Sequence, residues 1–136
     1  MAQQRLLVLD DDEAVGELLV FAAQRVGFEA RRCEQPQLFF EAVAGWSPTH
    51  LAIDLSMPEM DGIVVMQRLA IAGCSAWVII ASGAGSAETE EALQEARRLG
   101  LNVAGVLAKP FSLASLRTLL AQTQRSIGAS NGDESL

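Results

Sequence analysis

Three strongly apolar runs in this sequence end in charged residues, and this pattern limits the folds that the chain can adopt. The runs are Leu6–Leu9 before Asp10, Asp11 and Asp12, Leu51–Ile53 before Asp54, and Val103–Ala108 before Lys109. Transfer of an ionised group out of water costs several kcal/mol unless a partner compensates. Charges at the tips of apolar strands therefore indicate a site. The compensating groups that we expect are a divalent cation and Lys109, which is the only lysine in the chain.

Composition narrows the class of protein. Half of the 136 residues are hydrophobic and a fifth are charged, which is typical of a globular chain with one domain. We expect that domain over residues 1–125. Residues 126–136 lack apolar periodicity and predict a mobile tail or the start of a linker. The formal net charge of -7 argues against direct binding to DNA or RNA, which needs clustered Lys and Arg.

The sequence predicts neither a membrane span nor a secretion signal. The longest uncharged stretch, Leu69–Ala87, is interrupted by glycine and serine, which favours a helix end, a turn and a strand. The apolar run Leu6–Leu9 is too short for the core of a signal peptide. We therefore expect a cytoplasmic protein. Cys33 and Cys74 have no metal-binding spacing, and we interpret both as small buried residues.

Hydrophobic periodicity predicts strands that alternate with helices. The expected strands are 6–9, 28–33, 50–53, 76–81 and 103–108, and the expected helices are about 15–26, 36–44, 62–72, 87–99 and 113–120. Asp12 and Ser112 are candidate N-caps, and Gly27, Gly45 and Gly100 are candidate helix ends. The alternation predicts an α/β fold, a doubly wound five-stranded parallel sheet with five helices on its two faces. Burial on both faces also explains strands that read as continuous apolar runs.

The predicted topology brings the polar residues together. In open α/β sheets, ligands bind beyond the carboxyl ends of the strands. Asp10, Asp11, Asp54, Ser82 and Lys109 each lie at or just past such an end. We therefore expect these five residues to converge at one edge of the sheet.

The chemistry of such a cluster follows from its parts. Close carboxylates repel one another, and a cation such as Mg²⁺ relieves this repulsion. Asp10 and Asp11 are adjacent, as metal ligands would be, whereas Asp54 stands alone and is the better nucleophile toward phosphorus. Ser82 and Lys109 can then donate to phosphoryl oxygens. Pro110 can turn the chain sharply after Lys109, through a cis peptide if required.

Over residues 6–120, the sequence resembles the receiver domains of two-component response regulators. Four motifs carry the resemblance in the family's order, and they are the acidic run at Asp10–Asp12, the segment from Ile53 to Gly62 around Asp54, Ala81–Gly83, and Lys109–Phe111. The resemblance implies a flavodoxin-like (βα)5 fold with strand order 2-1-3-4-5. It also implies a signalling phosphoacceptor that is not an enzyme beyond catalysing its own phosphorylation and dephosphorylation.

The resemblance assigns a role to each site residue. Asp54 would accept a phosphoryl group from a histidine kinase or a histidine phosphotransfer protein. Asp10 and Asp11 would bind Mg²⁺ together with Asp54 and the main-chain carbonyl of Ser56, while Ser82 and Lys109 would respond to the phosphoryl group. The family's output face, formed by the fourth helix, the fifth strand and the fifth helix, would then bind an output domain, an effector protein or a second copy of the chain.

One position departs from the family pattern. Receivers commonly carry an aromatic residue three positions before the lysine, and here that residue is Val106. Valine has no ring to rotate, so either Ser82 and the following loop carry the signal alone or the coupling is altered. The small residues of Gly83–Ser86 indicate a loop that can move.

Two other functions remain open. Asp10–Asp12 also fits the opening of haloacid-dehalogenase-type phosphatases, although that reading leaves Asp54 unexplained and no acidic pair follows Lys109 in the position it requires. A receiver-fold binding module that acts without phosphorylation is the other alternative, which Val106 permits.

Several polar residues also have simpler interpretations. Asp12 and Asp61 are best read as a helix cap and a turn residue. Ser82 can cap a turn, and Lys109 can be a surface lysine. His50 has no ligand partner in the sequence, and we assign it no role.

Overall fold

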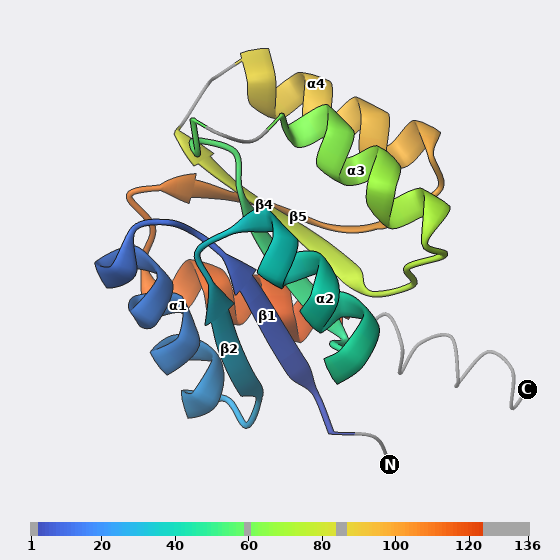
Figure 1. The fold of residues 1–136 in the computed structure, drawn as a ribbon. Coiled ribbons are helices and arrows are strands. Elements are labelled where there is room, and N and C mark those ends of the chain that lie inside the picture. The colour runs from blue at the N-terminus through green and yellow to red at the C-terminus, as the bar shows by residue number, and fades with distance from the viewer. Residues whose placement is uncertain (1–2, 59–60, 84–86, 124–136) are drawn as a thin grey trace, which may run out of the picture.

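The computed structural model is a three-layer α/β structure in which helices cover both faces of a central sheet (Figure 1). It describes residues 3–58, 61–83 and 87–123. The predicted tail at 126–136 and most of the predicted mobile loop at 83–86 lie outside the described residues.

All five strands are parallel and lie in the order β2-β1-β3-β4-β5. Their bounds are β1 Arg5–Leu9, β2 Glu29–Cys33, β3 His50–Asp54, β4 Trp77–Gly83 and β5 Asn102–Lys109. This arrangement confirms the flavodoxin-like fold and places the carboxyl ends of all the strands at one edge. β1 and β3 are adjacent there, so Leu9 and Ile53 are paired directly before the two acidic ends.

Four helices are labelled in Figure 1, and a fifth follows β5. They are α1 Glu13–Arg25, α2 Pro36–Trp46, α3 Gly62–Ile71, α4 Ala87–Arg98, and a C-terminal helix whose described residues are 113–123. α1 and the C-terminal helix pack on one face of the sheet, and α2, α3 and α4 pack on the other. The predicted ends of α1 to α4 and of the strands are accurate to within two residues, whereas the C-terminal helix is described to residue 123, three past its predicted end.

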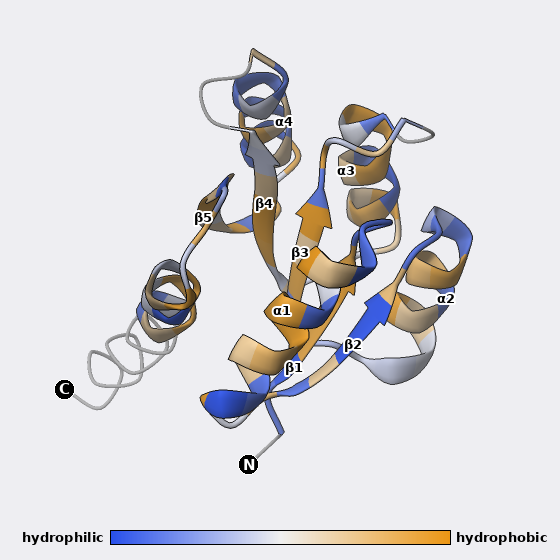
Figure 2. Ribbon diagram, turned by 90° about the vertical axis from the view of Figure 1, so that its left-hand side faces the viewer, coloured by the Kyte–Doolittle hydropathy of each residue, from blue (hydrophilic) through white to orange (hydrophobic). Residues whose placement is uncertain are grey.

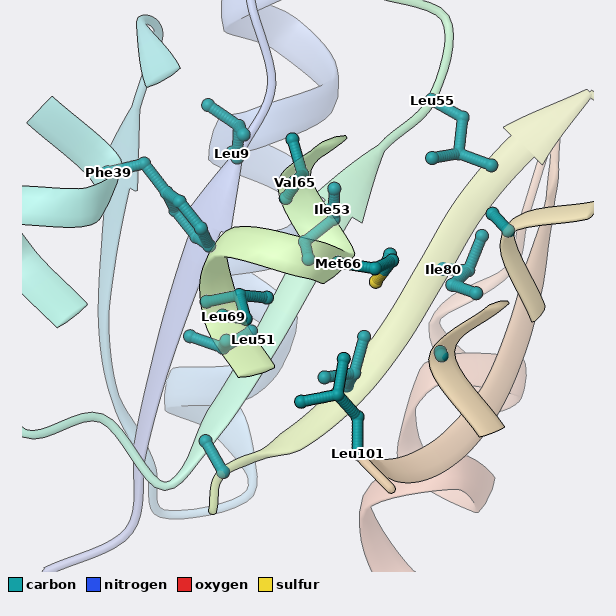
Figure 3. Close-up of a cluster of buried hydrophobic side chains, with 14 of the residues drawn as sticks. Leu9, Phe39, Leu51, Ile53, Leu55, Val65, Met66, Leu69, Ile80 and Leu101 are labelled. Carbon is teal, nitrogen blue, oxygen red and sulfur yellow. The ribbon is translucent and has the colours of Figure 1, made fainter. Parts of the chain in front are cut away.

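The core forms two layers because successive strand residues point to opposite faces. Leu7 and Leu9 of β1 join the layer under α2, α3 and α4, whereas Leu6 and Val8 join the layer under α1 and the C-terminal helix. Figure 3 shows the first layer, in which Phe39 of α2 and Met66 of α3 lie over the strands. Each strand that is buried on both faces therefore reads as a continuous apolar run.

The expectation of a continuous, buried apolar run is wrong for β2, one of the two edge strands. Its residues, Glu29 to Cys33, alternate between exposed and half-buried positions, and Figure 2 shows polar residues along it. An edge strand has a neighbour on one side alone, so polar side chains keep contact with water. The exposed Arg31 is accommodated for this reason.

Side-chain caps begin three helices. Asp12 Oδ1 accepts from Val15 N at 3.1 Å, and Asp61 Oδ1 accepts from Ile63 N at 2.9 Å. Ser112 Oγ accepts from Ser115 N at 3.1 Å. The structural interpretation of Asp12 is thus confirmed, and Asp61 is a helix cap as well as a turn residue.

α2 does not end at Gly45 as predicted. It continues to Trp46, and Ser47 leaves the helix with a φ of 53°. The Trp46 carbonyl accepts from Arg5 Nη1 at 2.7 Å, and the Arg31 guanidinium lies 4.5 Å from the centre of the Trp46 ring. These contacts stabilise the last turn of α2, which continues beyond Gly45.

β5 contains one extra residue opposite Val78 and Ile79 of β4. Gly105 has a φ of 152°, and a Cβ atom there would lie 2.7 Å from Leu119 Cδ2. Glycine therefore allows both the bulge and the close approach of the C-terminal helix. Beyond the bulge, Ser82 pairs with Ala108 and Gly83 with Lys109, which sets the position of the lysine.

Among the residues that the structure describes, no helix is long and apolar enough to cross a membrane.

Candidate functional site

The edge formed by the carboxyl ends of the strands carries one lysine between two buried carboxylates. Lys109 Nζ lies 3.0 Å from Asp54 Oδ1 and 3.4 Å from Asp10 Oδ2. Asp54 is the last residue of β3, Lys109 is the last residue of β5, and Asp10 directly follows β1. Three separate strands therefore build this ion-pair network, as the predicted convergence requires.

Asp11 completes a cluster of three carboxylates with Asp10 and Asp54. One carboxylate oxygen from each residue lies within 4.8 Å of the other two. Asp10 and Asp54 are buried, whereas Asp11 is exposed. Carboxylate oxygens are hard ligands of the type that Mg²⁺ binds, and the open side at Asp11 leaves room for water ligands. The cluster therefore fits a divalent cation.

Asp10 is held by its own turn as well as by Lys109. Its Oδ1 accepts from Asp12 N at 2.9 Å, and its main-chain N donates to the Cys33 carbonyl at 3.1 Å. Burial raises the pKa of Asp10, and the Asp54 charge adds to this, against the opposing Asp12 hydrogen bond and Lys109 charge. A cation bound beside Asp10 would stabilise its ionised form against this effect of burial.

Asp54 is oriented by the turn that follows β3. Its Oδ1 accepts from Ser56 N at 2.8 Å as well as from Lys109. Leu55 N donates to the Ala81 carbonyl at 3.0 Å, which keeps this turn against β4. Ser56 thus lies beside the site, and its main-chain N–H donates to the Asp54 carboxylate.

Lys109 is partly buried, with a side chain that is 21% exposed. Burial lowers its pKa, but the hydrogen bond and charge of Asp54, followed by those of Asp10, outweigh burial and raise this pKa above its ordinary value. The lysine is therefore cationic at neutral pH. The Lys109–Pro110 peptide is cis, in agreement with the turn expected there.

Ser82 lies at the same edge, but its hydroxyl is directed to α4. It is buried near the end of β4, donates to the Gly83 carbonyl at 3.1 Å and is hydrogen-bonded to Thr89 Oγ1 of α4. Nothing in the sequence indicated Thr89 as a partner of Ser82. Its place near the start of the helix after β4 was the only signal, and that signal does not specify a partner.

Arg32 is a second residue whose contact at this site the sequence did not indicate. It belongs to the edge strand β2, and its Nη1 donates to the Asp10 carbonyl at 3.0 Å. The pair of arginines in a short strand was visible in the sequence, but which guanidinium turns toward the acidic residues depends on the face that each occupies.

Val106 lies away from the acidic cluster, on β5, and its side chain is 37% exposed. It borders a groove of about 630 Å³ between β5 and the C-terminal helix, whose lining includes Phe111 and Leu119. The groove occupies the face on which the family's aromatic residue would lie.

Comparisons with known proteins agree with the fold. The sequence model of the response regulator receiver domain matches residues 6–121. The chain is 28% identical over 129 residues to Response regulator MprA of Mycolicibacterium vanbaalenii, covering 92% of this chain and 54% of that protein. It is 25% identical over 117 residues to Sporulation initiation phosphotransferase F of Bacillus subtilis, covering 86% of this chain and 90% of that protein. The chain spans about half the length of MprA.

A solved structure shows the same fold. The receiver domain of a putative Luxo repressor protein from Vibrio parahaemolyticus has a TM-score of 0.79 at 20% identity, with 98% of each chain covered. The chain belongs to the response regulator receiver family, the signalling domains of two-component systems. Receiver domains bind Mg²⁺ at an acidic cluster, and Asp10, Asp11 and Asp54 form such a cluster here.

Proposed function

We propose that this chain is a phosphoacceptor that receives a phosphoryl group on Asp54 from a histidine kinase or a histidine phosphotransfer protein. The observation that carries this proposal is the position of Lys109 Nζ, 3.0 Å from Asp54 and 3.4 Å from Asp10 at the open edge of the sheet. One cation beside two buried carboxylates suits a site in which a third anion, the phosphoryl group, is to be accommodated.

Asp10, Asp11 and Asp54 would hold Mg²⁺, with the main-chain carbonyl of Ser56 as a further ligand. The ion supplies positive charge that offsets the carboxylates and the incoming phosphoryl oxygens. The three carboxylate oxygens within 4.8 Å of one another support this assignment. Because Asp54 Oδ1 already accepts from Ser56 and Lys109, we expect Oδ2 to attack phosphorus.

The transfer forms one bond and breaks another. A carboxylate oxygen of Asp54 bonds to phosphorus while the phosphorus–nitrogen bond of the donor's phosphohistidine breaks, and the imidazole nitrogen keeps the electron pair. The product is an acyl phosphate on Asp54. The protein contributes positioning and charge, which is most of what phosphoryl transfer needs.

Lys109 and Ser82 would detect the product. Lys109 can exchange its contact with Asp54 for a phosphoryl oxygen without leaving the site. To donate to the phosphoryl group, the Ser82 hydroxyl must turn away from the Gly83 carbonyl and from Thr89, which would alter the contact between β4 and α4. This exchange of partners gives two discrete arrangements for phosphorylation to select between.

The signal would reach partners through the face of α4, β5 and the C-terminal helix. Val106 has no aromatic ring that could rotate in response to phosphorylation, so we assign the change to Ser82 and α4. An effector protein, an output domain or a second copy of the chain would bind this face.

The phosphodonor would approach the opposite side of the site, beside α1. Leu18 and Phe21 of this helix are exposed apolar residues, with side chains 41% and 49% accessible. The Arg25 guanidinium lies 5.6 Å from the centre of the Phe21 ring. An apolar patch bordered by a cation is suited to a protein partner.

Intact-mass analysis after incubation with acetyl phosphate and Mg²⁺ tests the proposal. We expect one phosphoryl adduct that is absent in Asp54→Asn and absent when a chelator removes Mg²⁺. If wild type gains no adduct and forms no beryllofluoride complex, the phosphorylation proposal is wrong. Multiple-turnover hydrolysis of phosphate esters would then favour a phosphatase, and partner binding that survives Asp54→Asn would favour a phosphorylation-independent binding module.

A further inference from the structure

The Arg32 side chain extends from the edge strand β2 to the turn that holds Asp10 and Asp11. Its Nη1 donates to the Asp10 main-chain carbonyl at 3.0 Å and lies 3.8 Å from Glu34 Oε2. The side chain is 19% exposed, so most of its length is covered by the fold. A surface arginine would not be covered in this way.

Gly16 of α1 makes this path possible. A Cβ atom at Gly16 would overlap Arg32 Cδ and would lie 3.0 Å from Cγ and 3.2 Å from Nε. Gly16 is buried although it lies on the first turns of α1, because the arginine stem covers it. A glycine inside a helix costs about 1 kcal/mol relative to alanine, so its presence here matches the space that Arg32 occupies.

The guanidinium acts on the peptide that joins the two acidic residues. On one side of Asp10, the main-chain N–H of this residue donates to the Cys33 carbonyl at 3.1 Å. On the other side, Arg32 holds the carbonyl of the Asp10–Asp11 peptide. Asp11 is exposed, so the orientation of its carboxylate depends on this main chain more than on packing.

We propose that Arg32 is a positioning residue, which orients the Asp10–Asp11 turn for cation binding and reaches it only because residue 16 is glycine. This inference rests on the proposed function, because it assigns Mg²⁺ to the cluster. Groups that orient metal ligands are distinct from the ligands, and their loss weakens metal affinity by about tenfold or more.

An orienting role and a purely electrostatic role for Arg32 predict opposite changes in Mg²⁺ affinity when the side chain is removed. A cation close to the site repels Mg²⁺, so if Arg32 acted by charge alone, its removal would tighten Mg²⁺ binding. If Arg32 orients the turn, its removal weakens binding. Calorimetric titration with MgCl₂ distinguishes the two, and it does not depend on phosphorylation.

The test compares Arg32→Met, which keeps an unbranched stem without donors, with wild type. We expect Arg32→Met to weaken Mg²⁺ binding about tenfold. Arg31→Met is the matched control, because Arg31 is the neighbouring arginine on β2 but lies over Trp46, and it should keep wild-type affinity. Thermal unfolding without Mg²⁺ identifies any variant that has lost its fold.

Gly16→Ala provides an independent route to the same loss. The added methyl displaces Arg32, so this variant should weaken Mg²⁺ binding as Arg32→Met does, and the double variant should lose no more than either one. Unchanged or tighter binding by folded Arg32→Met, or additive losses in the double variant, would overturn the inference and leave the proposed function intact. Absence of Mg²⁺ binding by wild type would instead contradict both the inference on Arg32 and the proposed function.

Discussion

Lys109 contacts Asp54 across a strand that separates them. Lys109 ends β5 and Asp54 ends β3, and β4 lies between the two, yet Nζ is 3.0 Å from Oδ1. On β4, Asp54 is paired with Ala81 and Lys109 with Gly83, so small residues occupy the end of the strand between them. The long, flexible stem of lysine and the Asp54 side chain that meets it together close the distance between the two strands.

Replacement of Lys109 should therefore destabilise the metal-free protein. In Lys109→Met, Asp10 and Asp54 remain buried without their cation, and we expect a loss of about 2 kcal/mol in the free energy of unfolding in EDTA. Mg²⁺ should restore part of it. Urea unfolding with EDTA or MgCl₂ measures both values. Arg98→Met is the control, because the Arg98 side chain is 66% exposed, and this variant should change stability far less. An equal loss in the two variants would contradict the ion-pair assignment.

Mg²⁺ should stabilise the chain through Asp11. At a Mg²⁺ concentration ten times the dissociation constant, wild type should gain about 1.4 kcal/mol in the free energy of unfolding. Asp11→Asn should abolish this gain because the exposed ligand is lost. Asp12→Asn is the matched control, since asparagine caps a helix as well as aspartate does and Asp12 caps α1. Loss of the Mg²⁺ effect in both variants would indicate a general charge effect in place of a defined site.

His50 should make stability depend on pH. This residue is fully buried, its Nε2 lies 2.8 Å from Thr123 Oγ1 and its Nδ1 lies 2.9 Å from Thr49 Oγ1. Because Thr123 donates its own proton to the Leu120 carbonyl, we assign His50 Nε2 as the donor to Thr123. The histidine thus joins β3 to the C-terminal helix, a structural role that the sequence did not indicate.

Burial lowers the pKa of His50 from 6.5 to about 4. Between these values the unfolded chain binds the proton and the folded chain does not, so stability is complete above pH 6.5 and is lost as pH falls toward 4. The full linkage is about 3 kcal/mol. Unfolding by urea over this range should show a steeper pH dependence in wild type than in His50→Gln. Parallel profiles, or an ordinary pKa for the single imidazole by NMR, would contradict this prediction.

The groove beside Val106 should govern self-association if the chain dimerises through β5 and the C-terminal helix. Sedimentation of the beryllofluoride-bound form should show a dimer for wild type and a monomer for Val106→Glu, because a buried carboxylate without a partner opposes the interface. Val64→Glu on α3 is the matched control, since Val64 is 46% exposed on a different surface. Monomeric wild type at high concentration would instead favour a different partner for this face.

Local features of the sequence were sufficient to predict the fold class and the residues that meet at the site. Asp10, Asp54 and Lys109 follow apolar strands, and the carboxyl ends of parallel strands share an edge, so their convergence follows from strand order alone. Asp12 and Ser112 carry local capping signals, which act within one helical turn. Apolar runs and helix caps depend on near neighbours in the chain, which is why the sequence alone was sufficient to predict them.

Contacts between distant elements were decided only by the tertiary structure. The passage of Arg32 over Gly16, the bond between Ser82 and Thr89, and the burial of His50 against Thr123 each join residues from different elements. The same holds for the end of α2. The helix continues beyond Gly45 to Trp46 because Arg5 and Arg31 contact this tryptophan. Periodicity specifies the face on which a side chain lies, but packing of the whole domain determines which partner is within reach on that face.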